Sequence, residues 1–492
     1  MATSVANSVV HAINIGRDAA LAVAFGTSVA LDTFFLAMML PVFLATVGVG
    51  AYRNAVVPIL ERLIHAAGLP QATTVIRRLF TRNVAMLAAV GLGIAAMAPL
   101  YSPLLAGRLP SDTLTLMTTL SWAVLPMTLL SAAAGLTEGP MQTLGYYFWP
   151  AFFRGALPLG IALGALILGP TYGILGACYG GAAGALIQLL GTWLLLRHHP
   201  TGSDLPQEQV QHISEEVRQQ FGLLSAGVAI AYISPLIDQW MASFLGTGAV
   251  SILSYANRLI VGAASLAASA LSPGLLPHFS RLAARGETAQ LHKHYLAAAR
   301  MTWWIGIVLA GLTWVFSEPF VVLLYEHGQF TREDSLAVAT IVGWFCLQFP
   351  PMLAGIAGSA MLSASGQNKV FLPLSALIAT VNAAGNLCLM PFYGLAGIAL
   401  STVITYVLSL VTINVMLVRK GLIPPPWGLL RDGVISLGTG IALVLLLLTH
   451  DAKLAATPTG SQVALSALAL GMFGLVALYC TKEVLLAIRR TA

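Results

Sequence analysis

The chain has 492 residues, of which 58% are apolar and only 9% are charged. An ordinary soluble domain carries about 25% charged residues, which it needs to cover its surface. The composition therefore argues against a soluble enzyme, a nucleic-acid-binding module and a disordered scaffold. Because the apolar residues are spread over the whole length, we expect many membrane spans rather than a single anchor.

A spanning helix needs about 20 mostly apolar residues, and the sequence contains fourteen candidates. The first six are expected at 5–26, 31–58, 83–107, 115–137, 147–168 and 171–196. The next six are expected at 221–245, 251–279, 296–317, 335–363, 370–391 and 394–418, and the last two at 430–449 and 463–485. The predicted fold class is thus an all-α integral membrane protein.

The basic residues predict an orientation, because Lys and Arg stay on the cytoplasmic side of a membrane protein. With the N-terminus inside, the inner loops and the C-terminal tail hold 17 of the 24 basic residues, and the outer loops hold three. We therefore predict that both termini are cytoplasmic. The remaining four basic residues lie inside candidate spans, at Arg17, Arg53, Arg154 and Arg258.

An internal repeat divides the chain. The segment 170–176 recurs as 391–397, and the segment 57–63 recurs as 276–282 at nearly the same offset. Each repeat covers six spans, so both copies enter the membrane in the same direction, which is typical of alternating-access transporters. The predicted domains are an N-terminal six-helix lobe at 1–200, a cytoplasmic linker at 201–220, a C-terminal six-helix lobe at 221–420, and two extra transmembrane helices at 421–492.

Charges inside the spans are the candidate functional residues, because an Arg or Asp near the bilayer centre costs about 2.5–3.5 kcal/mol on insertion scales. Arg17 and Asp18 lie deep in the first span. Neighbours along a helix point to different faces, so Arg17 need not pair with Asp18. Asp32 is near enough in the chain to be the partner of Arg17 instead. The other candidates are Asp238, a possible charge partner, and His11, a possible proton-sensitive group.

The sign of these charges favours an anionic cargo. Up to four guanidinium groups would face two or three carboxylates, and the forked guanidinium binds phosphate oxygens in pairs. The sequence has no phosphate-binding loop, no H-E-x-x-H motif and no dinucleotide motif, and its four cysteines have no metal-binding spacing. We therefore expect no metal, no cofactor and no ATPase domain, and any driving force would come from an ion gradient or the membrane potential.

Several motifs together resemble the MurJ/MviN family of lipid II flippases, which belongs to the multidrug/oligosaccharidyl-lipid/polysaccharide exporter superfamily. The matching motifs are Gly16-Arg17-Asp18-Ala19, Phe25-Gly26, Asp32-Thr33-Phe34-Phe35, Leu40-Pro41, Ala55-Val56-Val57-Pro58, Ser254-Tyr255-Ala256-Asn257-Arg258-Leu259, Leu275-Leu276-Pro277 and Leu324-Tyr325-Glu326-His327-Gly328. The resemblance implies a bacterial inner-membrane protein with two lobes around a cationic cavity and a groove for a polyprenyl tail along the last two helices. It places Arg17, Asp32 and Arg258 on positions regarded as functional.

The sequence also departs from that family pattern. His11 stands where the family has an earlier Arg, Leu44-Ala45-Thr46 stand where it has an Arg pair, and Val49 and Val261 stand where it has acids. Asn257 replaces an Asp. Arg53 and Arg154 are the candidates to compensate for the missing charges, and the cargo could be a lipid-linked glycan other than lipid II.

The resulting prediction is a flippase, not an enzyme, that moves a polyprenyl-diphosphate-linked sugar from the inner to the outer leaflet. Its predicted substrate-binding residues are Arg17, Arg258, Arg154 and Arg53, with Asp18, Asp32 and Asp238 as charge partners, and a monovalent ion is a possible partner. The alternatives are an ion-coupled multidrug antiporter that uses those three carboxylates, a polytopic glycosyltransferase or polymerase, and a scaffold-like relative that transports nothing. The enzyme would depend on acidic residues and a His in the short loop between 317 and 334.

Overall fold

The computed structural model describes residues 2–110, 113–202 and 207–423. This part of the chain contains helices and turns but no strand. The two C-terminal spans predicted at 430–449 and 463–485 lie outside the described residues.

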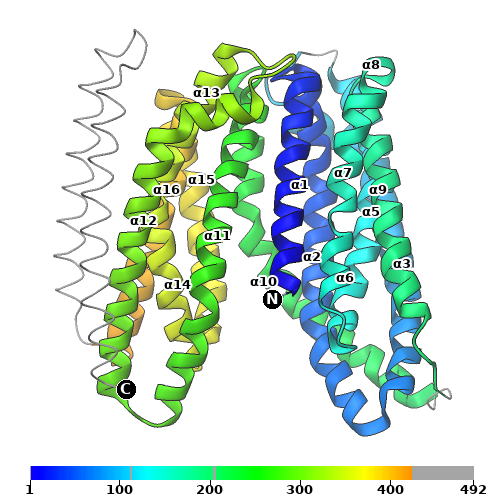
Figure 1. Cartoon of the computed structure of the whole chain (residues 1–492), viewed down its shortest axis with the longest axis vertical. Coiled ribbons are helices and arrows are strands. Elements are labelled where there is room, and N and C mark those ends of the chain that lie inside the picture. The colour runs from blue at the N-terminus through cyan, green and yellow to red at the C-terminus, as the bar shows by residue number, and fades with distance from the viewer. Residues whose placement is uncertain (1, 111–112, 203–206, 424–492) are drawn as a thin grey trace. The chain divides into compact units, whose positions relative to one another are not determined.

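Each of the first twelve predicted spans coincides with a helix or with a broken run of helices (Figure 1). The first half contains α1 (Ala2–Phe25), α2 (Val29–Ala67), α3 (Leu69–Ala96), α4 (Ala98–Ala106), α5 (Thr113–Thr143), α6 (Phe148–Phe153), α7 (Ala156–Leu163), η1 (Gly164–Leu168), α8 (Gly169–Tyr172) and α9 (Leu175–Arg197). The second half contains α10 (Gln207–Ala242), η2 (Ser243–Leu245), α11 (Ala249–Ala284), α12 (Thr288–Tyr325), α13 (Arg332–Cys346), α14 (Phe349–Ala364), η3 (Asn368–Val370), α15 (Phe371–Tyr393) and α16 (Leu395–Arg419).

Many of these helices are long and apolar enough to cross a membrane. Among the described residues, 10 spans pass on length and composition, or up to 11 when the bent pair α13 and α14 is taken as one span. The prediction of an all-α membrane protein is confirmed. Several helices are longer than the predicted spans; α2, for example, has 39 residues, because polar turns extend it beyond its apolar segment.

The chain forms two compact units. Unit 1 contains Met1–Tyr255 together with Val321–Val338, and unit 2 contains Ala256–Phe320 together with Ala339–Ala492. Residues 207–220 of the predicted linker form the beginning of α10, which packs on α2 in unit 1. The predicted lobe boundaries stay a prediction.

In unit 1, α2 packs against α5 and α10, α5 packs against α9, and α1 packs against α6 and α7 (Figure 1). The tightest contact joins α7 and α9 through glycines. A Cβ on Gly160 would lie 2.3 Å from the carbonyl oxygen of Gly180, and a Cβ on Gly180 would lie 2.2 Å from the carbonyl oxygen of Gly160. Only glycine permits this approach, which is a common way for membrane helices to gain van der Waals contact.

The repeat predicted from the sequence has a structural counterpart in each unit. Gly173 and Gly394 both break the chain between two helices, with φ values of 58° and 57° that favour glycine. Each donates its N–H to the carbonyl oxygen four residues earlier at 2.8 Å, that of Gly169 in one copy and of Met390 in the other. The same sequence therefore makes the same helix break twice.

In unit 2, α15 packs along α16, and α14 also contacts α16. Its core combines buried side chains from α11, α12, α14 and α16, among them Phe279, Tyr295, Met361 and Ile413. The Tyr295 hydroxyl donates a 2.8 Å hydrogen bond to Oδ1 of Asn414, so this buried polar group is satisfied.

Candidate functional site

Polar contacts in unit 1 join the α1–α2 turn (26–32) to residues 248–251 and to the loop 326–334. We call this set of contacts the latch. Asp32, which is fully buried, is its central residue. Its carboxylate accepts hydrogen bonds from the N–H of Gly248 and from both the N–H (2.7 Å) and the hydroxyl of Ser251. Asp32 therefore caps the N-terminus of α11, where a negative charge is favoured.

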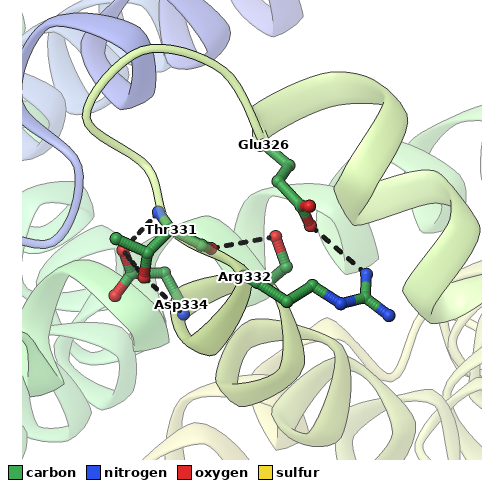
Figure 2. Close-up of polar contacts among 5 residues, drawn as sticks. Glu326, Thr331, Arg332 and Asp334 are labelled. Carbon is green, nitrogen blue, oxygen red and sulfur yellow. Dashed lines mark hydrogen bonds and ion pairs between the residues drawn. The ribbon is translucent and has the colours of Figure 1, made fainter.

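The loop 326–334 completes the latch. The N–H of Gln329 donates to the carbonyl oxygen of Val23 at 3.0 Å, and the Thr27 hydroxyl donates to Asp334 at 2.6 Å. Thr331 and Asp334 exchange hydrogen bonds as a capping box at the start of α13, as Figure 2 shows. The loop is thus held to the α1–α2 turn by both backbone and side-chain contacts.

Glu326 stabilises the other side of this loop. Its carboxylate forms a 3.3 Å ion pair with Arg332 (Figure 2). The hydrogen bond from Ser335, followed by the contact with Arg332, lowers the pKa of Glu326. The carboxylate is therefore held in its charged form.

Arg17 and Asp18 pair with each other. The Arg17 guanidinium lies 2.8 Å from the Asp18 carboxylate, and their side chains are 19% and 4% exposed. The Arg17 side chain therefore reaches its neighbour, although successive positions on a helix point to different faces. Asp32 is occupied at α11, so it is not the partner that the sequence suggested.

A second charged group lies toward the other end of unit 1, around Glu138 of α5. Arg154, in the turn between α6 and α7, places its Nε 3.5 Å from Glu138 and donates a 2.9 Å hydrogen bond to Oδ1 of Asn7 on α1. Arg53 of α2 packs its stem against Gly139, whose Cβ would lie 2.9 Å from the Arg53 Cγ. The structure thus brings two of the predicted arginines, Arg53 and Arg154, to one carboxylate.

The sequence did not predict Glu138 as a functional residue, because the predicted span ends at residue 137, whereas α5 continues to Thr143. The acid itself was the available signal, since a lone carboxylate at the edge of an apolar span needs a basic partner.

The other predicted residues are more dispersed. Asp238 lies half-buried on α10 in unit 1, and Arg258 lies half-buried on α11 in unit 2. His11 is exposed on α1, six residues before Arg17. The structure does not test the roles predicted for these three residues.

Unit 2 holds a buried polar cluster on α15 and α16. The Ser401 hydroxyl donates to the Asn382 carbonyl oxygen at 2.9 Å, and the Thr405 hydroxyl donates to the Ser401 carbonyl oxygen at 2.7 Å. The side-chain oxygen of Asn382 is buried and accepts no hydrogen bond from the described residues. Neutral oxygens of this kind are ligands for hard cations. In the described part of the chain, no group of three or more His, Cys, Asp and Glu residues could hold a metal ion.

Long apolar helices, a helix break that recurs in both halves of the sequence, and charges embedded in the helices are typical of a multi-pass membrane transporter. Residues 21–468 match the lipid II flippase MurJ family. The chain belongs to that family, as its motifs indicated, and the family is one of transporters rather than enzymes.

Similar proteins agree with this assignment. The chain is 26% identical to the lipid II flippase MurJ of Burkholderia cenocepacia, over 87% of this chain and 85% of that one. It is 25% identical to a probable lipid II flippase MurJ of Rhizobium meliloti, over 94% and 88%.

Solved structures share the fold. A lipid II flippase MurJ in an inward closed conformation matches with a TM-score of 0.76 at 22% identity, covering 96% of this chain and 98% of that one. An inward-facing multidrug transporter of the MATE family matches with a TM-score of 0.67 at 14% identity, covering 86% and 94%.

Proposed function

We propose that the protein is a flippase that moves a polyprenyl-diphosphate-linked sugar from the inner to the outer leaflet of the bacterial inner membrane, with both termini in the cytoplasm. The match to the lipid II flippase family over residues 21–468 carries this proposal. The chemistry agrees with it, because four arginines lie in the spans and guanidinium groups bind phosphate oxygens in pairs.

In this proposal Arg17 and Arg258 bind the diphosphate, and Arg53 and Arg154 contribute further positive charge. Asp18 orients Arg17 through their 2.8 Å ion pair. Asp238 is a charge partner on α10, and His11 is a proton-sensitive group on the exposed face of α1. The glycan is lipid II or another lipid-linked glycan.

Alternating access then requires the latch to open. With the latch closed by Asp32 and Asp334, the head group enters from the opposite end of unit 1, where the N-terminus lies. Release of the α11 N-terminus from Asp32 lets the head group leave on the other side of the membrane.

A monovalent cation is the proposed coupling ion, and its site is the polar cluster of unit 2. The buried side-chain oxygen of Asn382, with no hydrogen bond from the described residues, supports this assignment. A cation would satisfy that oxygen without requiring a carboxylate.

A multidrug antiporter is the alternative, and the MATE transporter supports it by fold alone. Such an antiporter needs carboxylates available to cationic drugs. Two of the three candidates are engaged, since Asp18 pairs with Arg17 and Asp32 caps α11. The flippase is therefore the better explanation of these charges.

Complementation in a bacterium depleted of its essential lipid II flippase tests the proposal. The wild-type chain should restore growth, whereas Arg17→Ala and Arg258→Ala should not, at equal membrane levels. Arg62→Ala is the matched control, because Arg62 forms an exposed ion pair with Glu216. Growth with both Arg17→Ala and Arg258→Ala would refute the roles given to these two arginines.

A further inference from the structure

The charged group around Glu138 differs from the Arg17–Asp18 pair in its net charge. Arg17 and Asp18 cancel each other. Around Glu138, the charges of Arg53 and Arg154 both act on a single carboxylate, which leaves one positive charge in excess. The excess positive charge around Glu138 attracts a diphosphate.

Burial determines which groups of this cluster can meet a ligand. The Glu138 side chain is 12% exposed and that of Arg154 is 42% exposed. Arg53 is also exposed, and it makes no hydrogen bond or ion pair with the described residues. The carboxylate therefore lies beneath, and both guanidinium groups have donors left for a ligand.

The Glu138 carboxylate and Asn7 together fix the direction of one guanidinium. Arg154 uses Nε toward Glu138 and one terminal nitrogen toward Asn7 at 2.9 Å, so its plane is held from two sides. Gly139 lets the Arg53 stem lie directly against α5, next to Glu138. The cluster therefore offers two guanidinium groups, each of which can bind phosphate oxygens in pairs.

The position of the cluster suits a lipid head group. Exposed aromatic side chains, among them Trp149 and Phe152, precede Arg154 on α6, and such residues mark the membrane–water interface. Asn7 is ten residues from Arg17 on α1, which is about 15 Å along the helix. Between them, His11 and Asn14 continue the same helix face as Asn7, and both are at least partly exposed.

We propose that Arg53 and Arg154, positioned by Glu138, form a loading site that receives the diphosphate of the lipid-linked glycan at the interface before it reaches Arg17. This inference rests on the proposed function. The polar face of α1 connects the two sites, and its amide and imidazole groups offer hydrogen bonds to the sugar during the transfer. Glu138 is a positioning residue, because it acts on the ligand through Arg154.

Binding of two lipids that differ by one phosphate tests the loading site. Undecaprenyl diphosphate and undecaprenyl monophosphate, each without sugar, are titrated onto the purified full-length protein in detergent. The wild type should prefer the diphosphate. Arg53→Ala and Arg154→Ala should each reduce that preference about tenfold, because each removes a charged hydrogen-bonding partner of one phosphate. Arg62→Ala, nine residues after Arg53 on the same helix, should leave it unchanged.

Glu138→Gln separates positioning from charge. The variant gains one net positive charge, so charge alone predicts tighter binding of both lipids. Positioning predicts instead that the preference for the diphosphate falls, because Arg154 loses its ion pair with residue 138 and is held less firmly. Arg53→Lys keeps the positive charge but loses the forked guanidinium, so it should also prefer the diphosphate less. Because the position is exposed, this variant replaces Glu138→Gln in the test if Glu138→Gln does not fold.

Transport kinetics provide the second measurement. In proteoliposomes, the loading-site variants should raise the lipid density needed for half-maximal flipping about tenfold at an unchanged maximal rate. If the wild type binds and flips the diphosphate lipid and all loading-site variants bind and flip it equally well, the loading site is overturned and the proposed function stands. A wild type that neither binds nor flips any diphosphate lipid would overturn the proposed function itself.

Discussion

The Asp32 carboxylate holds the latch closed, and Asp32→Asn should weaken it strongly. The carboxylate accepts hydrogen bonds from Gly248 and twice from Ser251 at the N-terminus of α11. An Asn can keep the bonds to one oxygen, but its NH₂ group then faces the Gly248 N–H. The variant loses one charged hydrogen bond, worth about 1.5–3 kcal/mol, and the charge–dipole interaction, worth about 0.3–2 kcal/mol.

The free energy of opening the latch should therefore fall by about 2–4 kcal/mol. This raises the ratio of open to closed latch at least about 30-fold. Hydrogen exchange of the peptide that contains residues 248–251 measures this opening directly. Exchange should accelerate at least about 30-fold in Asp32→Asn. Thr27→Val, which removes one hydrogen bond to the Asp334 carboxylate but leaves the cap of α11 intact, should accelerate it less, by about tenfold. Equal exchange in the wild type and Asp32→Asn would refute the role of Asp32 in closing the latch.

Three further predictions concern packing, pH and ions. Gly180→Leu should prevent assembly of unit 1, because even a Cβ at this position meets the Gly160 carbonyl oxygen; a large loss of folded protein in size-exclusion chromatography checks this, and normal yield would contradict it. The lowered pKa of Glu326 means that its contribution to stability is present above the unfolded pKa of about 4.3 and is lost as the pH falls through the folded pKa. The melting temperatures of wild type and Glu326→Gln should therefore differ at pH 6 and converge toward pH 3, and a difference that stays constant would disprove the assignment. Asn382→Leu should abolish any stabilisation by Na⁺ in a thermal shift assay, whereas an undiminished Na⁺ response would exclude this residue as a ligand.

Hydropathy was sufficient to locate the helices but not their ends. The first twelve predicted spans all coincide with helices, because lipid requires every backbone group to be paired within the segment. Polar turns outside the membrane are also helical, so that α2 continues from Val29 to Ala67 rather than ending at residue 58. For the same reason the predicted span ended just before Glu138, so the sequence did not reveal this residue as the partner of Arg154.

The partners of the charged residues could not be predicted from the sequence, because they depend on which distant segments pack together in the folded chain. Asp32 follows Arg17 closely in the chain, but its partners, Gly248 and Ser251, come from the second half of the sequence. Only the folded arrangement of unit 1 brings the α11 N-terminus to this carboxylate. The repeat was more informative, because Gly173 and Gly394 are needed for a local backbone shape that the sequence itself specifies.

The central claim is that the arginines of the spans carry a diphosphate head group across the membrane. The most direct test is the initial rate at which a polyprenyl-diphosphate disaccharide appears in the opposite leaflet of proteoliposomes. We predict rapid transfer with the wild-type protein, and transfer at the protein-free rate with Arg17→Ala combined with Arg258→Ala. Protein-free transfer with the wild type, or wild-type transfer with the double variant, would contradict the claim.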